Sequence, residues 1–432
     1  MKPRKSIRVV TLGCAKNTVD SEVLMGQLKL NNLKVLREGD KGHADTVVIN
    51  TCGFINDARE ESIDTILGYI EAKKKGRIKD VFVMGCLSER FKGPLMEEIP
   101  EVDEYFGVHD MAKVVERIGA EYRQNLLGER VLSTPHHYAY LKVAEGCNRS
   151  CSFCAIPGIL GVHISRTIED ILDEASRLAK QGVRELLLIS QDLTYYGVDL
   201  YNKQMLPELV ERLSGLGVFK WIRLHYLYPT TFPSGLVEAI GSHPDVCNYI
   251  DIPLQHINDR ILKSMRRGVT GTETRELIRL FRNSLPGAAI RTAFIVGYPG
   301  ETEEEFLELI EFVRETRFDR VGVFTYSHED DTHAFGLTDD VSEEVKHERA
   351  SQLMELQQEI SLQLNTEKIG KKFIVLIDRA EGEFFVGRTE MDSPEIDNEV
   401  LINVSTKLKI GDFCEVKITG ADSFDLYGSI TE

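Results

Sequence analysis

Three cysteines, Cys147, Cys151 and Cys154, form a C-x3-C-x2-C run near the middle of the chain. Three thiolates at this spacing can bind three irons of a four-iron cluster, because thiolate and iron are both soft partners. The fourth iron then has no protein ligand, so it can bind a small molecule and pass an electron to it. The run therefore predicts a redox-active iron–sulfur site, and the chain must fold so that these thiols meet.

Other uses of clustered cysteines fit the sequence less well. A structural zinc site usually has four ligands in paired C-x2-4-C groups, and no second such pair lies near this run. A disulfide framework is typical of small secreted proteins, whereas this chain is long, acidic and without a secretory signal. Unconnected core thiols are the third alternative. Cys247 and Cys414, which have no partner at ligand spacing, are expected to be of that kind.

The charge balance narrows the choice of partners. The 432 residues include 52 basic and 69 acidic side chains, a formal net charge of -17. This balance argues against broad, charge-driven nucleic-acid binding and suits a basic protein partner better. No apolar run approaches the roughly 20 residues that cross a bilayer, and no apolar stretch of signal-peptide type follows Met1–Arg8. We therefore expect a cytoplasmic protein without a membrane partner, whose cysteines stay reduced.

A second group of cysteines follows three expected strands in the first part of the chain. The strands are expected at Ile7–Leu12, Thr46–Asn50 and Val81–Met84, and helices at Ser21–Leu30 and Ala58–Glu71. This βαβαβ order predicts a small parallel sheet, whose ligands gather at the carboxyl ends of the strands. The cysteines that follow the three strands, here named the N-terminal cysteines, are Cys14, Cys52 and Cys86. They predict a second three-cysteine cluster; the alternative is three separate buried thiols.

The central part of the chain repeats a strand–helix alternation. Six strands are expected at Tyr138–Val143, Glu185–Ile189, Trp221–Leu227, Tyr249–Ile252, Ala289–Val296 and Val321–Tyr326. Helical patterns between them include Ile168–Lys180, Leu206–Leu213, Thr272–Arg282 and Glu303–Glu315. Six such units predict an open, partial (β/α)6 barrel, with active-site residues at the carboxyl ends of its strands. The first cysteine run, here named the barrel cysteines, begins directly after the first strand.

The end of the chain changes to an all-β pattern. A polar helix is expected from Ser342 to about Glu367. Five short strands separated by turn residues follow at Phe373–Ile377, Phe384–Arg388, Glu399–Asn403, Cys414–Ile418 and Leu426–Ile430. They predict a small antiparallel β-barrel. With a linker near 130–135, we expect an α/β protein of three domains: an α/β domain at 1–130, the partial barrel at 131–365 and the β-barrel at 366–432.

The barrel cysteines resemble the motif of radical S-adenosylmethionine (SAM) enzymes, which has an aromatic residue, here Phe153, before the last cysteine. The resemblance implies SAM at the open iron and cofactor contacts at strand ends. The residues expected to contact the cofactor are Phe153, Gln191, Asp192, Arg291, Ile295 and Gly297. For Arg291, a surface ion pair is the alternative. Lys263, Arg266 and Arg267 are expected to form a solvated basic patch.

Over nearly its full length the chain resembles the methylthiotransferases, whose terminal module is a TRAM domain. One branch, the MiaB type, modifies an adenosine of transfer RNA. The other, the RimO type, modifies the β-carbon of an aspartate in the twelfth protein of the small ribosomal subunit. The stretches Leu12–Glu22 and Pro253–His256 are similar to the RimO type, and the acidic C-terminal part agrees, with 14 acidic and 8 basic side chains in 365–432. Leu160 and the stretch His328–His333 depart from the family pattern.

The resemblance implies two 4Fe-4S clusters and SAM as cofactors. The cluster of the barrel cysteines would generate a radical from SAM that takes hydrogen from the aspartate β-carbon. The cluster of the N-terminal cysteines would deliver sulfur, so both must face one cavity. No amino-acid nucleophile or base is expected. The implied partners are the basic ribosomal protein, free or in the subunit, and a reducing electron donor. A transfer-RNA adenosine methylthiotransferase and a non-catalytic iron–sulfur electron carrier or sensor are the alternatives.

Overall fold

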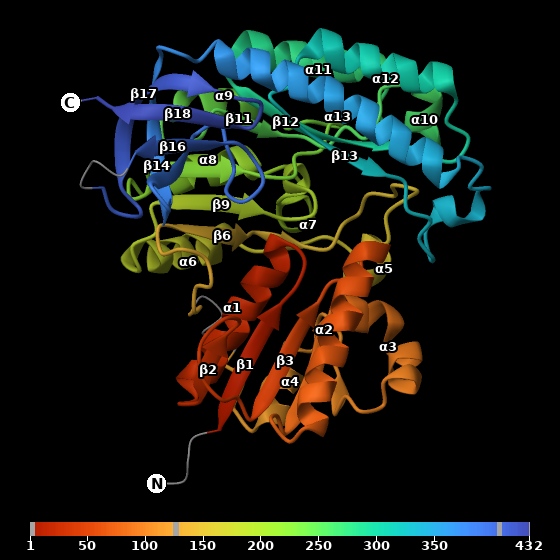
Figure 1. Ribbon diagram of the computed structural model, residues 1–432, viewed down its shortest axis with the longest axis vertical. Coiled ribbons are helices and arrows are strands. Elements are labelled where there is room, and N and C mark those ends of the chain that lie inside the picture. The colour runs from red at the N-terminus through yellow and green to blue at the C-terminus, as the bar shows by residue number, and fades with distance from the viewer. Residues whose placement is uncertain (1–4, 124–128, 404–407, 432) are drawn as a thin grey trace.

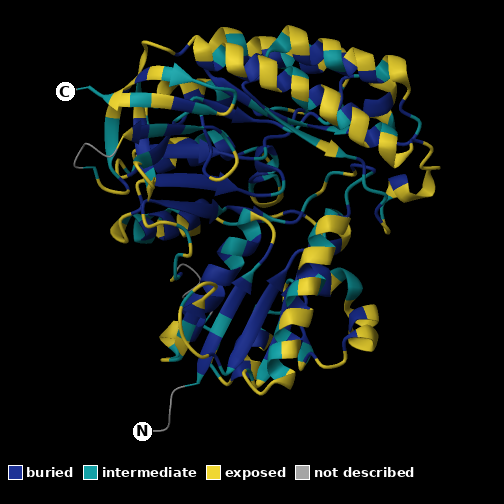
Figure 2. Cartoon of the chain, in the orientation of Figure 1, coloured by how far each residue is buried: buried dark blue, intermediate teal, exposed yellow. Residues whose placement is uncertain are grey.

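The computed structural model describes residues 5–123, 129–403 and 408–431, which form three packed bodies (Figure 1). An N-terminal α/β body, drawn in red and orange, lies against an open barrel, and a small β-barrel in blue packs on that barrel. Figure 2 shows the inner strands buried and the outer helices half exposed. The expected mixed α/β architecture is confirmed.

The N-terminal body contains a parallel sheet in the order β2-β1-β3-β4-β5. Its strands are β1 (Ser6–Thr11), β2 (Lys34–Arg37), β3 (Thr46–Thr51), β4 (Asp80–Gly85) and β5 (Glu104–Tyr105). The three central strands are the expected ones. The two edge strands were missed, because β2 is largely exposed and β5 has two residues, so neither has a continuous apolar run.

Helices cover both faces of this sheet. They are α1 (Ala15–Leu30), α2 (Asn56–Lys74), α3 (Cys86–Glu98) and α4 (Met111–Ile118). Leu24 and Leu28 of α1 pack with Val114 of α4 on one face. Ile66 of α2 and Leu95 of α3 pack on the other. The sheet is therefore enclosed, as its apolar central strands require.

The central body is the expected open barrel of six parallel strands. They are β6 (Tyr138–Lys142), β9 (Glu185–Ile189), β10 (Trp221–Leu224), β11 (Tyr249–Asp251), β12 (Ala289–Val296) and β13 (Arg320–Thr325). They pair as β6-β9-β10 and β11-β12-β13, and a bridge between Ile222 and Val246 joins the two groups. A short ribbon of β7 (Ala144–Glu145) and β8 (Ile164–Ser165) flanks the barrel cysteines.

Helices and short turns connect these strands. They are α5 (Ile156–Leu160), α6 (Ile168–Lys180), α7 (Val198–Tyr201), α8 (Leu206–Ser214), α9 (Leu236–Ser242), α10 (Asp259–Ser264), α11 (Gly271–Ser284), α12 (Glu303–Thr316) and α13 (Glu343–Thr366), with 3-10 turns η2 (Leu193–Tyr195) and η3 (His333–Gly336). Local sequence sets where the long helices begin. Capping boxes start two of them, with Thr270 and Glu273 at α11 and Thr302 and Glu305 at α12.

The C-terminal body is a closed barrel in the order β14-β15-β16-β18-β17. Its strands are β14 (Lys372–Glu381), β15 (Phe384–Thr389), β16 (Glu399–Asn403), β17 (Phe413–Ala421) and β18 (Asp425–Ile430). Each overlaps an expected strand. The barrel is not wholly antiparallel, however, because β16 and β18 pair in parallel. This pair closes the barrel, and strand positions along the chain do not specify which edges meet.

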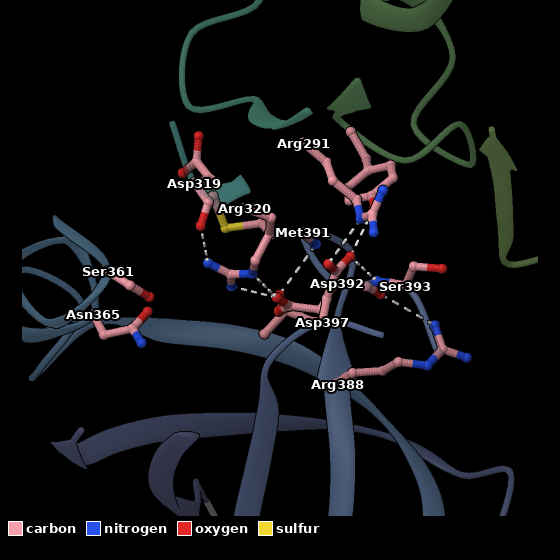
Figure 3. Close-up of polar contacts among 12 residues, drawn as sticks. Arg291, Asp319, Arg320, Ser361, Asn365, Arg388, Met391, Asp392, Ser393 and Asp397 are labelled. Atoms are coloured by element: carbon pink, nitrogen blue, oxygen red, sulfur yellow. Dashed lines mark hydrogen bonds and ion pairs between the residues drawn. The ribbon is translucent and has the colours of Figure 1, made fainter. Parts of the chain in front are cut away.

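The loop between β15 and β16 joins the small barrel to the central one through buried polar contacts (Figure 3). Asp392 pairs with Arg320 of β13 through both Nε and Nη2. Asp397 accepts from Arg291 Nε at 3.2 Å and from Tyr249 Oη at 2.7 Å. Buried ion pairs with added hydrogen bonds fix geometry strongly, so this loop holds the two barrels in one orientation.

Removing one partner of the Arg320–Asp392 pair should destabilise the protein. We expect Asp392→Ala to lower the free energy of unfolding by about 3–5 kcal/mol, because it leaves a buried guanidinium unpaired. Urea denaturation measures the loss. Glu315→Gln, which breaks an exposed pair with Arg275, should cost less than about 1 kcal/mol. If both variants lost the same free energy of unfolding, the buried pair would stabilise the protein no more than the exposed pair does.

The contribution of the Arg320–Asp392 pair to the free energy of unfolding should depend on pH. Burial raises the pKa of Asp392, but the Arg320 guanidinium, together with Lys368 and the Thr389 hydroxyl, outweighs this effect and holds that pKa below its ordinary value. A carboxyl with a lowered folded-state pKa stabilises the protein above its unfolded pKa, about 3.9, and loses this effect as the pH falls further. The stability difference between the wild type and Asp392→Ala should therefore shrink below about pH 4.

Candidate functional site

A cavity of about 1020 Å3 lies between the N-terminal body and the open end of the central barrel. Its volume is at the upper end of the range for small-molecule sites, about 300–1,000 Å3. Both cysteine groups line it: Cys14, Cys52, Cys86, Cys147, Cys151 and Cys154. Helices α1 and α5 lie at this junction (Figure 1). The structure thus brings the two expected cysteine groups into one chamber.

The N-terminal cysteines stand at neighbouring strand ends, each beside a glycine that has no room for a side chain. A Cβ on Gly13 would lie 2.6 Å from Cys52 Cβ, and one on Gly85 would lie 2.5 Å from the Thr51 carbonyl oxygen. Gly13 and Gly85 also have positive φ values of 88° and 100°, which disfavour other residues. A Cβ on Gly53 would lie 2.5 Å from Leu87 Cα.

Side-chain hydrogen bonds hold these strand ends in place. Asn17 Nδ2 donates to the carbonyls of Leu12 at 2.9 Å and Thr51 at 3.1 Å. Ser62 Oγ donates to the Cys52 carbonyl at 2.9 Å and accepts from the Cys52 amide at 3.1 Å. The backbone around the thiols is therefore fixed before any ligand binds, as a cluster site requires.

The barrel cysteines follow β7, and two polar side chains contact the middle one. Arg267 Nη1 donates to Cys151 Sγ at 3.2 Å, and Tyr228 Oη lies 3.3 Å from the same sulfur. Arg267 is 3% exposed, and its guanidinium also stacks on the Tyr228 ring. The prediction of a solvated patch is therefore wrong for Arg267. Hydrogen bonds to a cysteine sulfur that binds an iron–sulfur cluster shift the reduction potential of that cluster.

The thiols suit a wide ligand rather than a single ion. Burial raises the pKa of the Cys147 thiol to about 11 and that of Cys154 to about 12. Burial also raises the pKa of Cys52 and Cys86. Metal binding to such thiols must release protons. Among the described residues, no three His, Cys, Asp or Glu side chains converge tightly enough to hold one metal ion. Such an open arrangement suits a ligand broader than one ion, such as a four-iron cluster.

Three of the expected cofactor contacts line the cavity. They are Phe153, Gln191 and Ile295. Phe153 and Ile295 pack against the same cluster, which includes Met265 and Tyr326. The Gln191 amide is buried, and neither of its polar atoms has a hydrogen-bond partner among the described residues. An unsatisfied buried amide costs free energy unless a ligand binds it, so Gln191 is placed to contact a polar ligand.

The other three expected contacts lie outside the cavity wall. Asp192 accepts from Arg149 Nε at 2.7 Å and from Thr194 Oγ1 at 2.6 Å, so it orients Arg149. Arg291 pairs with Asp251 and Asp397, whose side chains are both buried, so its ion pairs are not the surface pair of the alternative, and its contact with the cofactor stays a prediction. A Cβ on Gly297 would lie 2.3 Å from Lys346 Cγ, so this glycine serves the packing of α13.

A buried ion pair joins the two walls of the cavity. Arg90 of α3 and Glu329, in the loop after β13, lie 3.0 Å apart with side chains 3% exposed. Arg90 also donates to the carbonyls of Gly53, at 3.1 Å, and Asp330. Arg90 therefore connects the turn beside Cys52 to the loop that departs from the family pattern. Leu160, the other departure, lines the same cavity.

Sequence reasoning missed Arg90, Arg267 and Tyr228. Tyr228 lies just past the carboxyl end of β10, so the strand-end rule could have found it. Arg90 lies within a helix and Arg267 in a loop, and their partners are far away in the sequence. No local pattern marks such residues.

Comparisons with known proteins agree with this arrangement. Three family models match the chain: Uncharacterized protein family UPF0004 at residues 6–107, the Radical SAM superfamily at 141–313 and the TRAM domain at 369–431. The structure described contains no helix long and apolar enough to cross a membrane.

Relatives cover nearly the whole chain. It is 56% identical over 426 residues to the ribosomal protein uS12 methylthiotransferase RimO of Christiangramia forsetii, covering 98% of this chain and 94% of that one. The protein of the same name from Flavobacterium johnsoniae is 56% identical over 427 residues, covering 98% of each. A solved structure of the radical SAM methyltransferase TsrM from Kitasatospora setae, with cobalamin and a 4Fe-4S cluster bound, has a TM-score of 0.54 at 14% identity and covers 75% of each chain. That likeness concerns the fold alone.

Proposed function

Because the chain belongs to the RimO family of radical SAM methylthiotransferases, we propose that it methylthiolates the β-carbon of an aspartate in ribosomal protein uS12. Its cofactors are SAM and 4Fe-4S clusters. The observation that carries the proposal is the single cavity lined by both cysteine groups. Sulfur insertion at an unactivated carbon needs a radical source and a sulfur source within reach of one substrate atom. Clusters bound by the two cysteine groups would both face this cavity.

The bound cofactors supply the one-electron chemistry, and the protein binds, orients and excludes water. The barrel cysteines would hold the cluster at which SAM binds. The unpaired amide of Gln191 would bind a polar group of SAM, while Phe153 and Ile295 would form an apolar wall. The N-terminal cysteines would hold the second cluster, through which sulfur is delivered. No side chain is required as nucleophile or base.

The partners follow from charge and chemistry. A net charge of -17 favours a basic ribosomal protein, met free or in the assembled subunit, and disfavours RNA as the main contact. A reducing electron donor must also dock. We place the reaction in the cytoplasm, where thiols stay reduced. We further propose that residues 1–130, 131–365 and 366–432 act as the sulfur-delivery, radical and docking domains.

The test compares two acceptors. Anaerobically reconstituted protein with SAM and a reductant is incubated with uS12 and, separately, with transfer RNA lacking the modification. Mass spectrometry should find methylthiolated aspartate in uS12 and no modified adenosine. Modification of the RNA alone would favour the transfer-RNA branch. Absence of 5′-deoxyadenosine in every reaction would favour the electron carrier.

Arg267 should set the potential of the barrel cluster. Arg267→Met removes a cation that donates to Cys151 Sγ, so adding an electron nearby becomes harder. We expect the midpoint potential to fall by at least about 60 mV, a tenfold change in a one-electron equilibrium. Redox titration followed by electron paramagnetic resonance measures it. The exposed neighbour is the control, and Arg266→Met should leave the potential unchanged. An unshifted potential in Arg267→Met would show that this contact does not tune the cluster.

A further inference from the structure

One cation that lines the cavity has neither a carboxylate nor a cysteine sulfur as a partner among the described residues. The lysine and arginine side chains that line the described cavity are Lys16, Arg59, Arg149 and Arg267. Arg59 lies 3.6 Å from Glu329, Arg149 lies 2.7 Å from Asp192, and Arg267 donates to Cys151 Sγ. No carboxylate of the described residues lies within ion-pair distance of Lys16. With respect to the residues that the structure describes, Lys16 is therefore free to bind a ligand.

An aromatic ring holds this lysine in position. Lys16 Nζ lies 3.3 Å from the centroid of the Tyr226 ring, a cation–π contact. Tyr226 has a φ of 59°, which is unfavourable for an aromatic residue, and its amide donates to Asp251 Oδ2 at 3.0 Å. The Tyr226 side chain also packs against the cluster of Val19 and Tyr140, so the surrounding structure holds the ring and the ring holds the ammonium group. Such a fixed cation can bind an anion with little loss of side-chain freedom.

The other charges in the cavity make this cation selective. Its wall carries more carboxylates than cations: Asp20, Asp57, Glu145, Glu329, Asp339 and Glu343. Asp20 and Glu145 both pair with Lys142 rather than with Lys16. An incoming carboxylate would therefore be repelled by most of the wall and attracted at Lys16.

We propose that Lys16 binds the side-chain carboxylate of the target aspartate and so positions its β-carbon. The inference rests on the proposed function, in which that carbon is the reacting atom. The carboxylate carbon is bonded directly to the β-carbon, so a fixed ammonium group limits where the reacting atom can lie. Lys16 and Cys14 line the same cavity, so the carboxylate would be held in the chamber where sulfur is delivered. The same charge would favour aspartate over asparagine at the target position.

The test compares uS12 carrying aspartate or asparagine at the target position. We expect Lys16→Met to raise the Kd of the aspartate form about 10- to 100-fold, as loss of a charge-assisted hydrogen bond requires, and to change that of the asparagine form less than about twofold. The Kd is measured on reconstituted protein by fluorescence anisotropy. Lys16→Arg should keep the preference for aspartate. Lys113→Met, at an exposed lysine of the same body, is the matched control and should change neither Kd.

The outcomes separate the possible sources of the carboxylate. SAM carries one too, so a raised Kd for SAM in Lys16→Met, with the aspartate preference intact, would overturn the inference. Equal weakening of both uS12 forms would overturn it as well, because a purely structural role predicts that result. If wild-type protein methylthiolates uS12 and Lys16→Met keeps the wild-type preference for aspartate over asparagine, the inference about Lys16 is wrong, while the proposed function stands. If wild-type protein leaves uS12 unmodified, the proposed function fails and the inference with it.

Discussion

Cys14→Ala should abolish methylthiolation of uS12 while SAM cleavage continues. Cys14 belongs to the N-terminal cysteines, whereas the barrel cysteines lie on a different body across the cavity. Two thiolates would not retain the sulfur-delivering cluster, but the radical source would keep all three of its ligands. Chromatography with mass spectrometry measures 5′-deoxyadenosine and modified uS12 in one reaction. The iron content should fall from about eight to about four per chain.

A matched cysteine tests whether this effect is specific. Cys414 in β17 is a half-buried thiol that does not line the cavity. Cys414→Ala should keep both the iron content and methylthiolation. If Cys14→Ala still methylthiolates at the wild-type rate, the N-terminal cysteines do not carry the sulfur. If it also loses SAM cleavage, the two cysteine groups are not independent.

The placement of the N-terminal cysteines could be predicted because it depends on local order. A strand, a helix and a second strand form one parallel unit with a fixed hand, so β1, β3 and β4 become neighbours. Residues at their carboxyl ends must then meet. The fold of these strands is confirmed, and the thiols lie together, although their binding of a cluster stays a prediction.

Some contacts of the candidate residues join distant segments and could not be predicted. Arg291 could be placed on its strand, but its partner Asp397 lies 106 residues away in a loop of the small barrel. Arg267 looked like part of a charge run, and only the closed barrel shows it beside Cys151, 116 residues earlier. A charged residue reads as solvated in sequence because its buried partner is not visible there. Such pairs require the tertiary structure.

Arg90→Met should uncouple SAM cleavage from sulfur insertion. Arg90 connects the Cys52 turn to the loop after β13, so its loss removes the buried ion pair between the two walls of the cavity. Breaking a buried pair costs up to about 3–5 kcal/mol, and here Glu329 keeps only Arg59, at 3.6 Å, as an ionic partner, beside the Ser327 hydroxyl. A displacement of about 1 Å between reacting groups lowers rates about 100-fold. We therefore expect the ratio of methylthiolated uS12 to 5′-deoxyadenosine to fall about 100-fold.

A double variant distinguishes two effects of Arg90→Met: displacement of the cavity walls, and loss of the Arg90 charge itself. Arg90→Met combined with Glu329→Met removes both charges and fills the space with apolar chains, so the walls can pack together again. Its product ratio should recover at least about tenfold relative to Arg90→Met, because the buried Glu329 carboxylate, which the single variant leaves with the more distant Arg59, is then absent. Equal ratios in the single and double variants would mean that the Arg90 guanidinium acts on substrate directly. A wild-type ratio in Arg90→Met would mean that other contacts hold the walls, and that the two cysteine groups keep their separation without this ion pair.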